Sequence, residues 1–419
     1  MTDYTEQKTD KKIIAHMMAK PAGPDCNLKC GYCFYLEKEA LFPEGSRYRM
    51  SDEVLETYIR KTAEYQSVLP ELLYAWQGGE PTLMGLDFFR KAVELEKRYA
   101  GGRRIVNTLQ TNGILLDDEW CRFLAENKFL IGLSLDGPKD IHDRYRKDRG
   151  GEPTFDRVMR AMNLMKQYGV EFNILACVTR ESAKRPLDVY RFFKEQDIRF
   201  IQFTPIVERI PNPESERLGL KLGMPASIDN SDEANVTPWT MLPEDYGNFL
   251  IGIFDEWVKN DIGSVFVMNF EWFGVNWMGM PQANCFFSER CGHAVIVEHN
   301  GDVYSCDHFV YPKYRLGNIL KEEPGDMIDS GKQLQFGAVK EEMLPKYCRE
   351  CDFLFACRGE CPKHRFLKTP DGEPGLNYLC AGYKKFFNYI RPYMEAITKT
   401  IRKGYPAEKV MDMIREGMI

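Results

Sequence analysis

The sequence predicts an α/β protein in which a parallel sheet carries helices outside it, followed by a cysteine-rich region. Short apolar runs alternate with segments of helical periodicity from about residue 13 to 210, roughly six times. Eight of the thirteen cysteines then fall between residues 285 and 380. Alternation of strands and helices of this length is typical of a doubly wound sheet or of a barrel.

The repeated unit can be followed along the chain. Strands are predicted within residues 72–81, 104–113, 130–138, 170–179 and 198–207, and helices over 86–100, 117–128, 154–169 and 186–196. The first three of these strands end in the polar turns QGGEP, QTNG and SLDG. Because ligands of such folds lie at the carboxyl ends of the strands, these turns and the first cysteine segment indicate one shared site.

The pattern changes after residue 210. Residues 211–238 are polar and rich in Pro, Gly and Ser, which predicts a long surface loop, and a helix is predicted over 243–260. We therefore expect an α/β domain over 13–235, linker helices over 236–280, a cysteine-rich domain over 281–385 and a helical tail over 386–419.

The composition argues against several classes of protein. The 419 residues carry a net charge of −6, whereas nucleic-acid binders usually carry a basic balance. The chain has no run of about eighteen apolar residues, so no membrane span is expected. The N-terminus, MTDYTEQKTDKK, lacks the apolar core of a secretory signal. We expect a cytoplasmic protein with reduced cysteines that binds neither nucleic acid nor membrane.

Three cysteines stand in one short stretch, KPAGPDCNLKCGYCFY. Cys26, Cys30 and Cys33 have the spacing C-x3-C-x2-C. A [4Fe–4S] cluster normally takes four thiolates, so three would leave one iron open for a small molecule. The same reasoning separates catalytic from structural zinc sites. The alternative is a zinc ion whose fourth ligand comes from elsewhere, for example His16.

The later cysteines are numerous enough for two complete four-ligand sites. Two structural zinc ions are the alternative that the spacing leaves open. Two isolated cysteines, Cys121 and Cys177, fall within a predicted helix and a predicted strand, where we expect buried thiols. The eight later cysteines are Cys285, Cys291, Cys306, Cys348, Cys351, Cys357, Cys361 and Cys380.

These motifs resemble those of a known family. C-x3-C-x2-C with an aromatic before its third cysteine, on the first βα loop of a parallel barrel, is similar to the signature of radical S-adenosylmethionine (SAM) enzymes. The resemblance implies a partial (β/α)6 TIM-like barrel and a cluster whose open iron chelates SAM, which is then cleaved to a 5′-deoxyadenosyl radical. It also implies SAM contacts from Gly78, Gly79 and Glu80 of QGGEP and from Ser134 and Asp136 of SLDG.

The second cysteine set resembles the SPASM domain, a unit of small β-hairpins and helices with two auxiliary [4Fe–4S] clusters. The resemblance therefore implies three [4Fe–4S] clusters in all. It assigns the ligands crosswise, a pattern with a parallel in two-cluster ferredoxins. Auxiliary cluster I takes Cys285, Cys291, Cys306 and Cys361, and auxiliary cluster II takes Cys348, Cys351, Cys357 and Cys380.

Within that group, the chain resembles anaerobic sulfatase-maturating enzymes from about residue 13 to 385. The resemblance is carried by KPAGPDCNLKCGYCFY, QTNGILL, SLDGPKDIHDRYR, FIQFTPIVE, CDHFVYP and CRGECPKHRF. One departure is Glu360, where family members often have a second glycine. The family oxidises a Cys or Ser in a C/S-x-P/A-x-R motif to formylglycine. The implied partners are an unfolded or nascent sulfatase polypeptide and a flavodoxin or ferredoxin reductant.

The resemblance also implies a catalytic base. Asp307, directly after the third ligand of cluster I, would remove the remaining proton while the second electron leaves through the auxiliary clusters. The alternative is a solvated hairpin carboxylate, or one bonded to loop amides. His308 is another candidate base by residue type, although a hydrogen-bonding or structural place suits it better.

Four more residues are candidates for contacts with SAM or substrate. Gln77 precedes the glycines at a strand end and is a candidate substrate contact, with an ordinary polar turn as the alternative. Tyr35 and the backbone of Tyr32 are expected to flank the adenosyl group, with core packing as the alternative. Arg146 is a candidate partner for a carboxylate of SAM or substrate, with a surface cation on a helix as the alternative.

Two other functions remain open at this point. Another SPASM peptide-modifying enzyme would form thioether or carbon–carbon crosslinks in a ribosomal peptide. Such enzymes often carry a leader-peptide recognition domain, whereas only about a dozen polar residues precede the first predicted strand here. The other hypothesis is a zinc-stabilised binding module without catalysis, which bound iron and acid-labile sulfide would contradict.

Overall fold

The computed structural model describes residues 15–225, 235–292 and 294–419. Residues 13 and 14 of the predicted first domain, and 226–234 of the predicted 211–238 loop, therefore lie outside the described residues. One sheet of ten strands organises the fold, in the order β10-β9-β8-β1-β2-β3-β4-β5-β6-β7. A second sheet pairs two short strands, β11 (Leu367–Lys368) and β12 (Pro374–Leu376).

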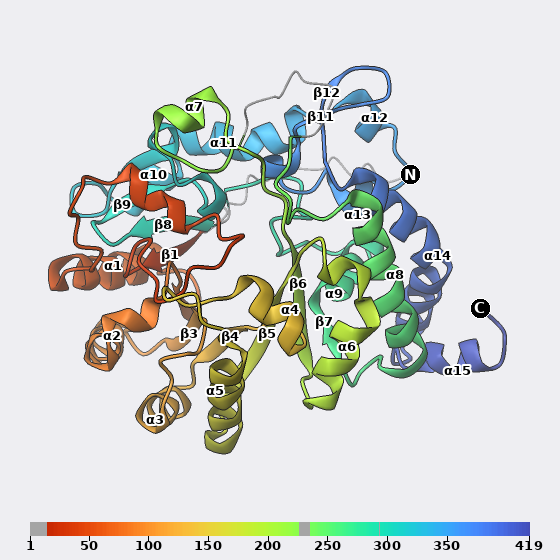
Figure 1. Cartoon of the computed structure of the whole chain (residues 1–419), viewed down its shortest axis with the longest axis horizontal. Helices are drawn as coiled ribbons and strands as arrows, with labels where there is room; N and C mark the ends of the chain where they lie inside the picture. Colours follow the sequence, from red (N-terminus) through yellow and green to blue (C-terminus); the bar gives the residue numbers. More distant parts are fainter. Residues whose placement is uncertain (1–14, 226–234, 293) are drawn as a thin grey trace, which may run out of the picture.

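The predicted repeat of strands and helices is confirmed, because neighbouring strands from β1 to β7 pair in parallel and helices cover the outside of the sheet (Figure 1). The strands are β1 (His16–Lys20), β2 (Glu71–Trp76), β3 (Arg104–Thr111), β4 (Leu130–Ser134), β5 (Glu171–Val178), β6 (Phe200–Pro205) and β7 (Phe266–Val267). The helices are α1 (Asp52–Tyr65), α2 (Leu86–Tyr99), α3 (Asp118–Glu126), α4 (Lys139–Tyr145), α5 (Phe155–Tyr168) and α6 (Pro186–Glu195).

Local sequence explains where these helices begin and end. Ser51 accepts a hydrogen bond from the N–H of Val54 at the start of α1, and Asp117 caps α3 through the N–H of Trp120. Gly169 ends α5 in the left-handed conformation, with φ +67°. The helix α1 was not predicted from the sequence, and α4 was expected only as the helix of the surface-cation alternative for Arg146.

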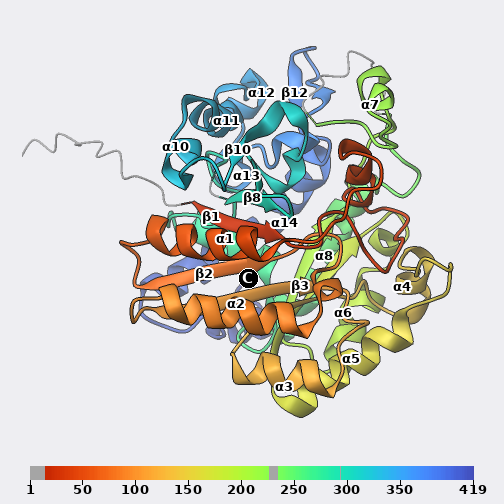
Figure 2. The same cartoon turned by 90° about the vertical axis from the view of Figure 1, so that its left-hand side faces the viewer.

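The central position of β1 joins the barrel to the cysteine-rich region. β1 pairs in parallel with β2 on one side and with β8 (Ala294–Glu298) on the other. The antiparallel strands β9 (Asp302–Tyr304) and β10 (Arg315–Asn318) then extend the sheet (Figure 2). The domain boundaries given above stay a prediction, and the main sheet runs across them.

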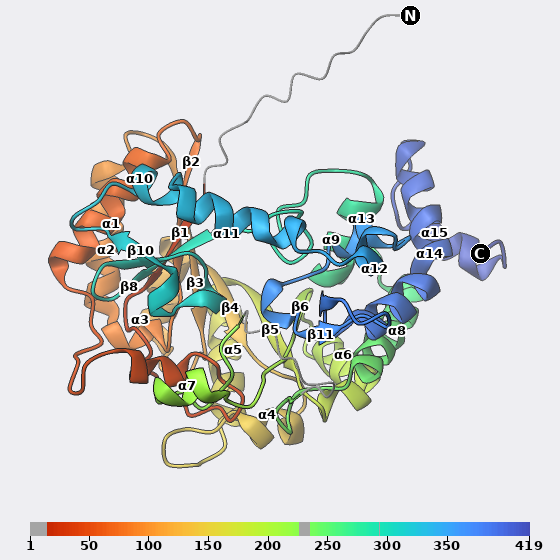
Figure 3. The ribbon, with the colours of Figure 1, turned by 90° about the horizontal axis from the view of Figure 1, so that it is seen from above.

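The middle and the end of the chain pack together. α8 (Pro243–Asn260) lies against α14 (Cys380–Arg402), and α15 (Lys409–Arg415) closes the chain beside them (Figure 3). Among the described residues, none of the helices is both long and apolar enough to cross a bilayer. The other helices are α7 (Pro213–Arg217), α9 (Met268–Trp277), α10 (Pro324–Ile328), α11 (Gly331–Glu342), α12 (Lys346–Arg349) and α13 (Leu354–Cys357), and the 3-10 turns include η1 (Leu36–Leu41), η4 (Asp307–Phe309) and η6 (Pro362–His364).

Candidate active site

The cysteine loop after β1 is packed against the glycine turn after β2. The N–H of Gly79 donates to the carbonyl of Gly23, and that of Glu80 to the carbonyl of Asp25, both at 2.8 Å. A Cβ on Gly79 would stand 2.0 Å from the Asp25 carbonyl oxygen, and Gly78 has φ +135°. The turn needs both glycines because two backbones touch here, and it thereby supports the cysteine loop.

Glu80 is buried, and donors surround its carboxylate. It accepts from the N–H and hydroxyl of Thr82 at 3.1 and 2.6 Å, from the Thr111 hydroxyl at 2.8 Å and from the Asn112 N–H at 2.8 Å. Burial raises the pKa of Glu80, and these hydrogen bonds oppose that shift. The Asn112 amide lies 3.7 Å from the Cys26 sulfur. Glu80 thus ties two strand-end turns to the cysteine loop, and its contact with SAM stays a prediction.

Asp136, just beyond β4, forms a buried polar group with Tyr32 and Arg146. Its Oδ2 accepts from the Tyr32 hydroxyl at 2.5 Å and from Arg146 Nε at 2.9 Å, and its Oδ1 accepts from the Cys177 N–H at 3.0 Å. Arg146 is 7% exposed, so the surface-cation alternative is wrong. Both carboxylate oxygens of Asp136 already accept hydrogen bonds within the protein. A ribose hydroxyl that bonds to Asp136 would therefore share an oxygen with one of these donors.

The remaining strand ends carry further polar side chains. The Ser134 hydroxyl at the end of β4 accepts from Gln110 Nε2 at 2.9 Å. Gln110 belongs to β3 and was not predicted, although it stands in the quoted QTNG turn. Gln77 continues β2, with its N–H donating to the Ala19 carbonyl at 2.9 Å. All of these groups lie at the carboxyl edge of the sheet, where the sequence places the site.

The thiols of the first loop influence one another's pKa. Burial raises the pKa of Cys26 to about 12, and the charges of Glu80 and Cys33 add to the shift. Burial is also the main cause of the raised pKa of Cys30 and of Cys33. Thiolates here need the positive charge of a metal, which fits an iron–sulfur cluster. His16 begins β1 at its opposite end, about 13 Å along the strand, so it does not fit as a fourth ligand.

The eight later cysteines gather in two groups. The charges of Cys285, Cys291 and Cys306 act on Cys361, whose pKa is raised well above its usual value, first by burial. Cys361 therefore lies with the earlier cysteines. The second group lines one cavity with Phe353, Tyr383 and Phe387, and consists of Cys348, Cys351, Cys357 and Cys380. The ligand role of each cysteine stays a prediction.

The separation of these thiols bears on the zinc alternatives. Across residues 15–225, 235–292 and 294–419, no three His, Cys, Asp or Glu side chains converge on a single-ion site. A structural zinc needs four donors, with sulfurs about 2.3 Å from one ion. The thiolates of a [4Fe–4S] cluster bind different irons, so their sulfurs stand farther apart.

Asp307 lies where the two cysteine regions meet. It follows Cys306 directly and accepts a hydrogen bond from the ammonium of Lys20, the last residue of β1. The Lys20 side chain is 2% exposed, and its Nζ lies 4.1 Å from the centroid of the Tyr35 ring. Tyr35 donates in turn to Glu298 of β8. Asp307 is therefore ion-paired with a buried lysine, and neither a fully solvated carboxylate nor one held by loop amides describes it.

More charged residues surround Asp307 than the sequence indicated. Glu208, after β6, forms a buried ion pair with Lys363 beside the Cys361 loop. Lys38 in η1 places its ammonium 3.5 Å from the centroid of the Tyr311 ring, and burial lowers its pKa to about 7. In the sequence, these residues are marked only by a charge within an otherwise apolar or motif-rich phrase, such as Glu208, the last residue of FIQFTPIVE.

His308 contacts a cysteine. Its Nδ1 lies 3.4 Å from the Cys361 sulfur, and burial, followed by nearby positive charges, holds its pKa well below the usual value. His308 thus lies in hydrogen-bonding contact with a cysteine, as the structural place expected for it requires. Of the two isolated thiols, Cys121 is buried as predicted, whereas Cys177 is half-buried with its sulfur 3.6 Å from an Arg146 nitrogen.

Comparison with known proteins agrees with this geometry. The radical SAM superfamily matches residues 21–193, and an iron–sulfur cluster-binding domain, SPASM, matches residues 285–352. A serine-type anaerobic sulfatase-maturating enzyme of Bacteroides thetaiotaomicron is 48% identical over 404 residues, 96% of each chain. A cysteine-type anaerobic sulfatase-maturating enzyme of Clostridium perfringens is 36% identical over 389 residues, 92% of this chain and 99% of its own.

Solved structures extend the likeness to three dimensions. Native anSMEcpe with bound AdoMet and the Cp18Cys peptide superposes with a TM-score of 0.79 at 35% identity, covering 92% of this chain and 99% of that one. Streptococcus suis SuiB bound to S-adenosylmethionine shares the fold, with a TM-score of 0.56 at 16% identity over 87% of this chain and 77% of its own. The full-length relatives cover both cysteine regions. The chain therefore belongs to the radical SAM family of anaerobic sulfatase-maturating enzymes.

Proposed function

We propose that this protein oxidises a cysteine or serine side chain of a sulfatase polypeptide to formylglycine. The place of Asp307 carries the proposal. It stands next to Cys306 of the auxiliary region, and its ion pair with Lys20 fixes it at the end of the strand that leads into the SAM-binding cysteine loop. A proton acceptor between two redox centres suits a reaction that removes a hydrogen atom from the substrate β-carbon, a proton from its hydroxyl or thiol group, and one electron.

Each atom and electron removed from the substrate has a proposed acceptor. When bound, SAM on the first cluster supplies a radical that takes one hydrogen atom from the substrate β-carbon. Asp307 would then take the proton of the substrate hydroxyl or thiol, and the auxiliary clusters that the eight later cysteines would hold would accept one electron when bound. Serine gives the aldehyde directly, whereas cysteine gives a thioaldehyde that water converts to the aldehyde with release of hydrogen sulfide. Lys20 holds the carboxylate in place, which makes it a positioning residue.

The proposed substrate site lies at the same carboxyl edge of the sheet. Gln77 lies half-buried after β2, and we infer that its amide contacts the reacting side chain. The SAM contacts are proposed to come from Tyr32, Tyr35, Gly78, Gly79, Glu80, Ser134, Asp136 and Arg146. Relatives named as serine-type and cysteine-type enzymes both match, which supports a sulfatase peptide with either residue as the substrate class.

The partners and the compartment belong to the same proposal. The cluster chemistry needs one-electron reductants, so a flavodoxin or ferredoxin is the proposed donor. A net charge of −6 supports action on protein rather than nucleic acid. Thirteen cysteines, of which eleven are assigned to oxygen-sensitive clusters, support a reducing cytoplasm.

The test is an anaerobic assay with two peptides. The reconstituted protein receives SAM, dithionite and a peptide of about eighteen residues that bears C-T-P-S-R, or its S-T-P-S-R counterpart. A loss of about 18 Da from the cysteine peptide or about 2 Da from the serine peptide, with new reactivity toward a hydrazine probe, is expected. A loss of about 2 Da without aldehyde reactivity would indicate a crosslink instead. Cleavage of SAM with both peptides unchanged would contradict the proposed substrate.

A further inference from the structure

The segment from Cys357 to Cys361 links the two auxiliary cysteine groups by the shortest stretch of chain. Its three inner residues all have positive φ, with Arg358 at 49°, Gly359 at 68° and Glu360 at 51°. Residues other than glycine rarely adopt this conformation. At position 360 the family often has glycine, which accepts it freely. This chain instead holds a glutamate there, against the backbone preference.

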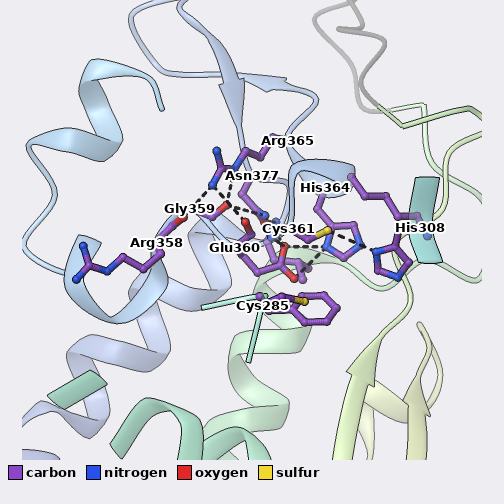
Figure 4. Close-up of polar contacts among 12 residues, drawn as sticks. Cys285, His308, Arg358, Gly359, Glu360, Cys361, His364, Arg365 and Asn377 are labelled. Carbon is purple, nitrogen blue, oxygen red and sulfur yellow. Dashed lines mark hydrogen bonds and ion pairs between the residues drawn. The ribbon is translucent and has the colours of Figure 1, made fainter. Parts of the chain in front are cut away.

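The side chain of Glu360 turns inward, and donors enclose it (Figure 4). It is 0% exposed. Its carboxylate accepts from the Cys361 N–H at 2.6 Å and from Asn377 Nδ2 at 2.7 Å, and His364 Nδ1 lies 2.8 Å from it. These contacts favour the ionised carboxylate, because hydrogen bonds donated to a carboxylate stabilise its charged form. A negative charge is therefore fixed next to a proposed ligand of auxiliary cluster I.

A positive charge also contacts this segment, through its backbone. The Arg365 guanidinium donates to the carbonyls of Gly359, Arg358 and Glu360 at 2.7, 2.8 and 3.2 Å. It therefore holds the turn that carries Glu360. The Glu360 carboxylate, by contrast, contacts Cys361 itself, through the N–H of that residue.

We propose that Glu360 lowers the reduction potential of auxiliary cluster I relative to auxiliary cluster II. A fixed negative charge in a low-dielectric surrounding disfavours the added electron of a reduced cluster. The carboxylate would therefore favour passage of one electron from cluster I, whose proposed ligand Cys306 precedes the base Asp307, to cluster II. The inference rests on the proposed clusters, but its readout needs no sulfatase substrate.

The experiment is a redox titration of the full-length, reconstituted protein followed by EPR. Addition of SAM identifies the signal of the SAM-binding cluster, because only that cluster binds it. Glu360→Gln removes the charge at constant volume, and Glu360→Gly introduces the residue that suits the backbone. Glu289→Gln is the matched control, because Glu289 also lies between two ligands in sequence but its side chain is 59% exposed in an ion pair with Arg358.

We expect both Glu360 variants to raise the potential of one auxiliary cluster by at least a tenfold change in its one-electron equilibrium constant, about 59 mV. The other auxiliary cluster should move less, and Glu289→Gln should move neither. Unchanged potentials in a Glu360 variant with full iron content would overturn the inference, and so would an equal shift of all three clusters. Loss of iron from both variants would also overturn it, because the carboxylate would then serve only to hold the pocket together.

Discussion

Substitution of Gly79 by alanine tests the contact between the glycine turn and the cysteine loop. The added Cβ would stand 2.0 Å from the Asp25 carbonyl oxygen and 2.7 Å from the Pro24 carbonyl carbon. Contacts of real Cβ atoms are at least 3.0 Å, so one backbone must move by about 1 Å. Misplacement of reacting groups by that amount costs on the order of 10²-fold in rate. We expect Gly79→Ala to cleave SAM roughly 10²-fold more slowly, with about eight auxiliary irons retained.

The assay is the release of 5′-deoxyadenosine, followed with and without peptide, together with the iron content. Gly31→Ala is the matched control, because Gly31 lies in the same cysteine loop and its added Cβ would find the nearest atom, on Tyr145, at 3.5 Å. That distance is an ordinary contact, so this variant should cleave SAM at the wild-type rate. Wild-type cleavage by Gly79→Ala, or equal losses in both variants, would refute the reasoning.

Further predictions concern the clusters, the base and two buried carboxylates. Alanine at any of the three cysteines of the first loop should abolish SAM cleavage and leave about eight irons, whereas surviving cleavage would show that the cluster is elsewhere. Asp307→Ala should still release 5′-deoxyadenosine but lose most formylglycine, and full product formation would place the base elsewhere. Glu208→Gln leaves Lys363 as an unpaired buried charge, so the free energy of unfolding should fall by about 3 kcal/mol, measured by denaturant titration, and an unchanged midpoint would contradict the buried pair. Burial raises the pKa of the Glu96 carboxyl from 4.5 to about 7, so its ionisation lowers the stability of the fold as the pH rises across that range. Glu96→Gln should therefore increase the free energy of unfolding at pH 8 by up to about 3 kcal/mol, seen as a higher unfolding temperature, and leave it unchanged at pH 4. An equal gain at both pH values would exclude this cause.

The parts of the fold and site that the sequence predicts are those encoded locally. The strand-end turns and the cysteine spacings lie within a few residues of one another, so their chemistry can be read directly. The pairing of β1 with β8 joins segments more than 270 residues apart, and no local pattern encodes it. The Lys20–Asp307 ion pair has the same origin, since its partners are 287 residues apart in sequence.

Arg146 shows a different limit of sequence reasoning. It is the last residue of the helical phrase IHDRYR, in which charged residues usually face solvent. The helix α4 ends at Tyr145, and Arg146 is its C-cap, with ψ 87°, so the chain turns inward there and the guanidinium reaches Asp136. The sequence indicates that a helix is present, but only the backbone geometry at its last residue decides which way the next side chain points.

The place of β1 between β2 and β8 also limits how this enzyme can be divided. If the cysteine-rich region were removed, β1 would become an edge strand, with five residues from His16 to Lys20 offering unpaired backbone groups. Such an edge recruits other strands and favours aggregation. A shortened chain that keeps only the SAM-cleaving half would need a new cover for this edge, so any relative that lacks the auxiliary region must protect its first strand by another means.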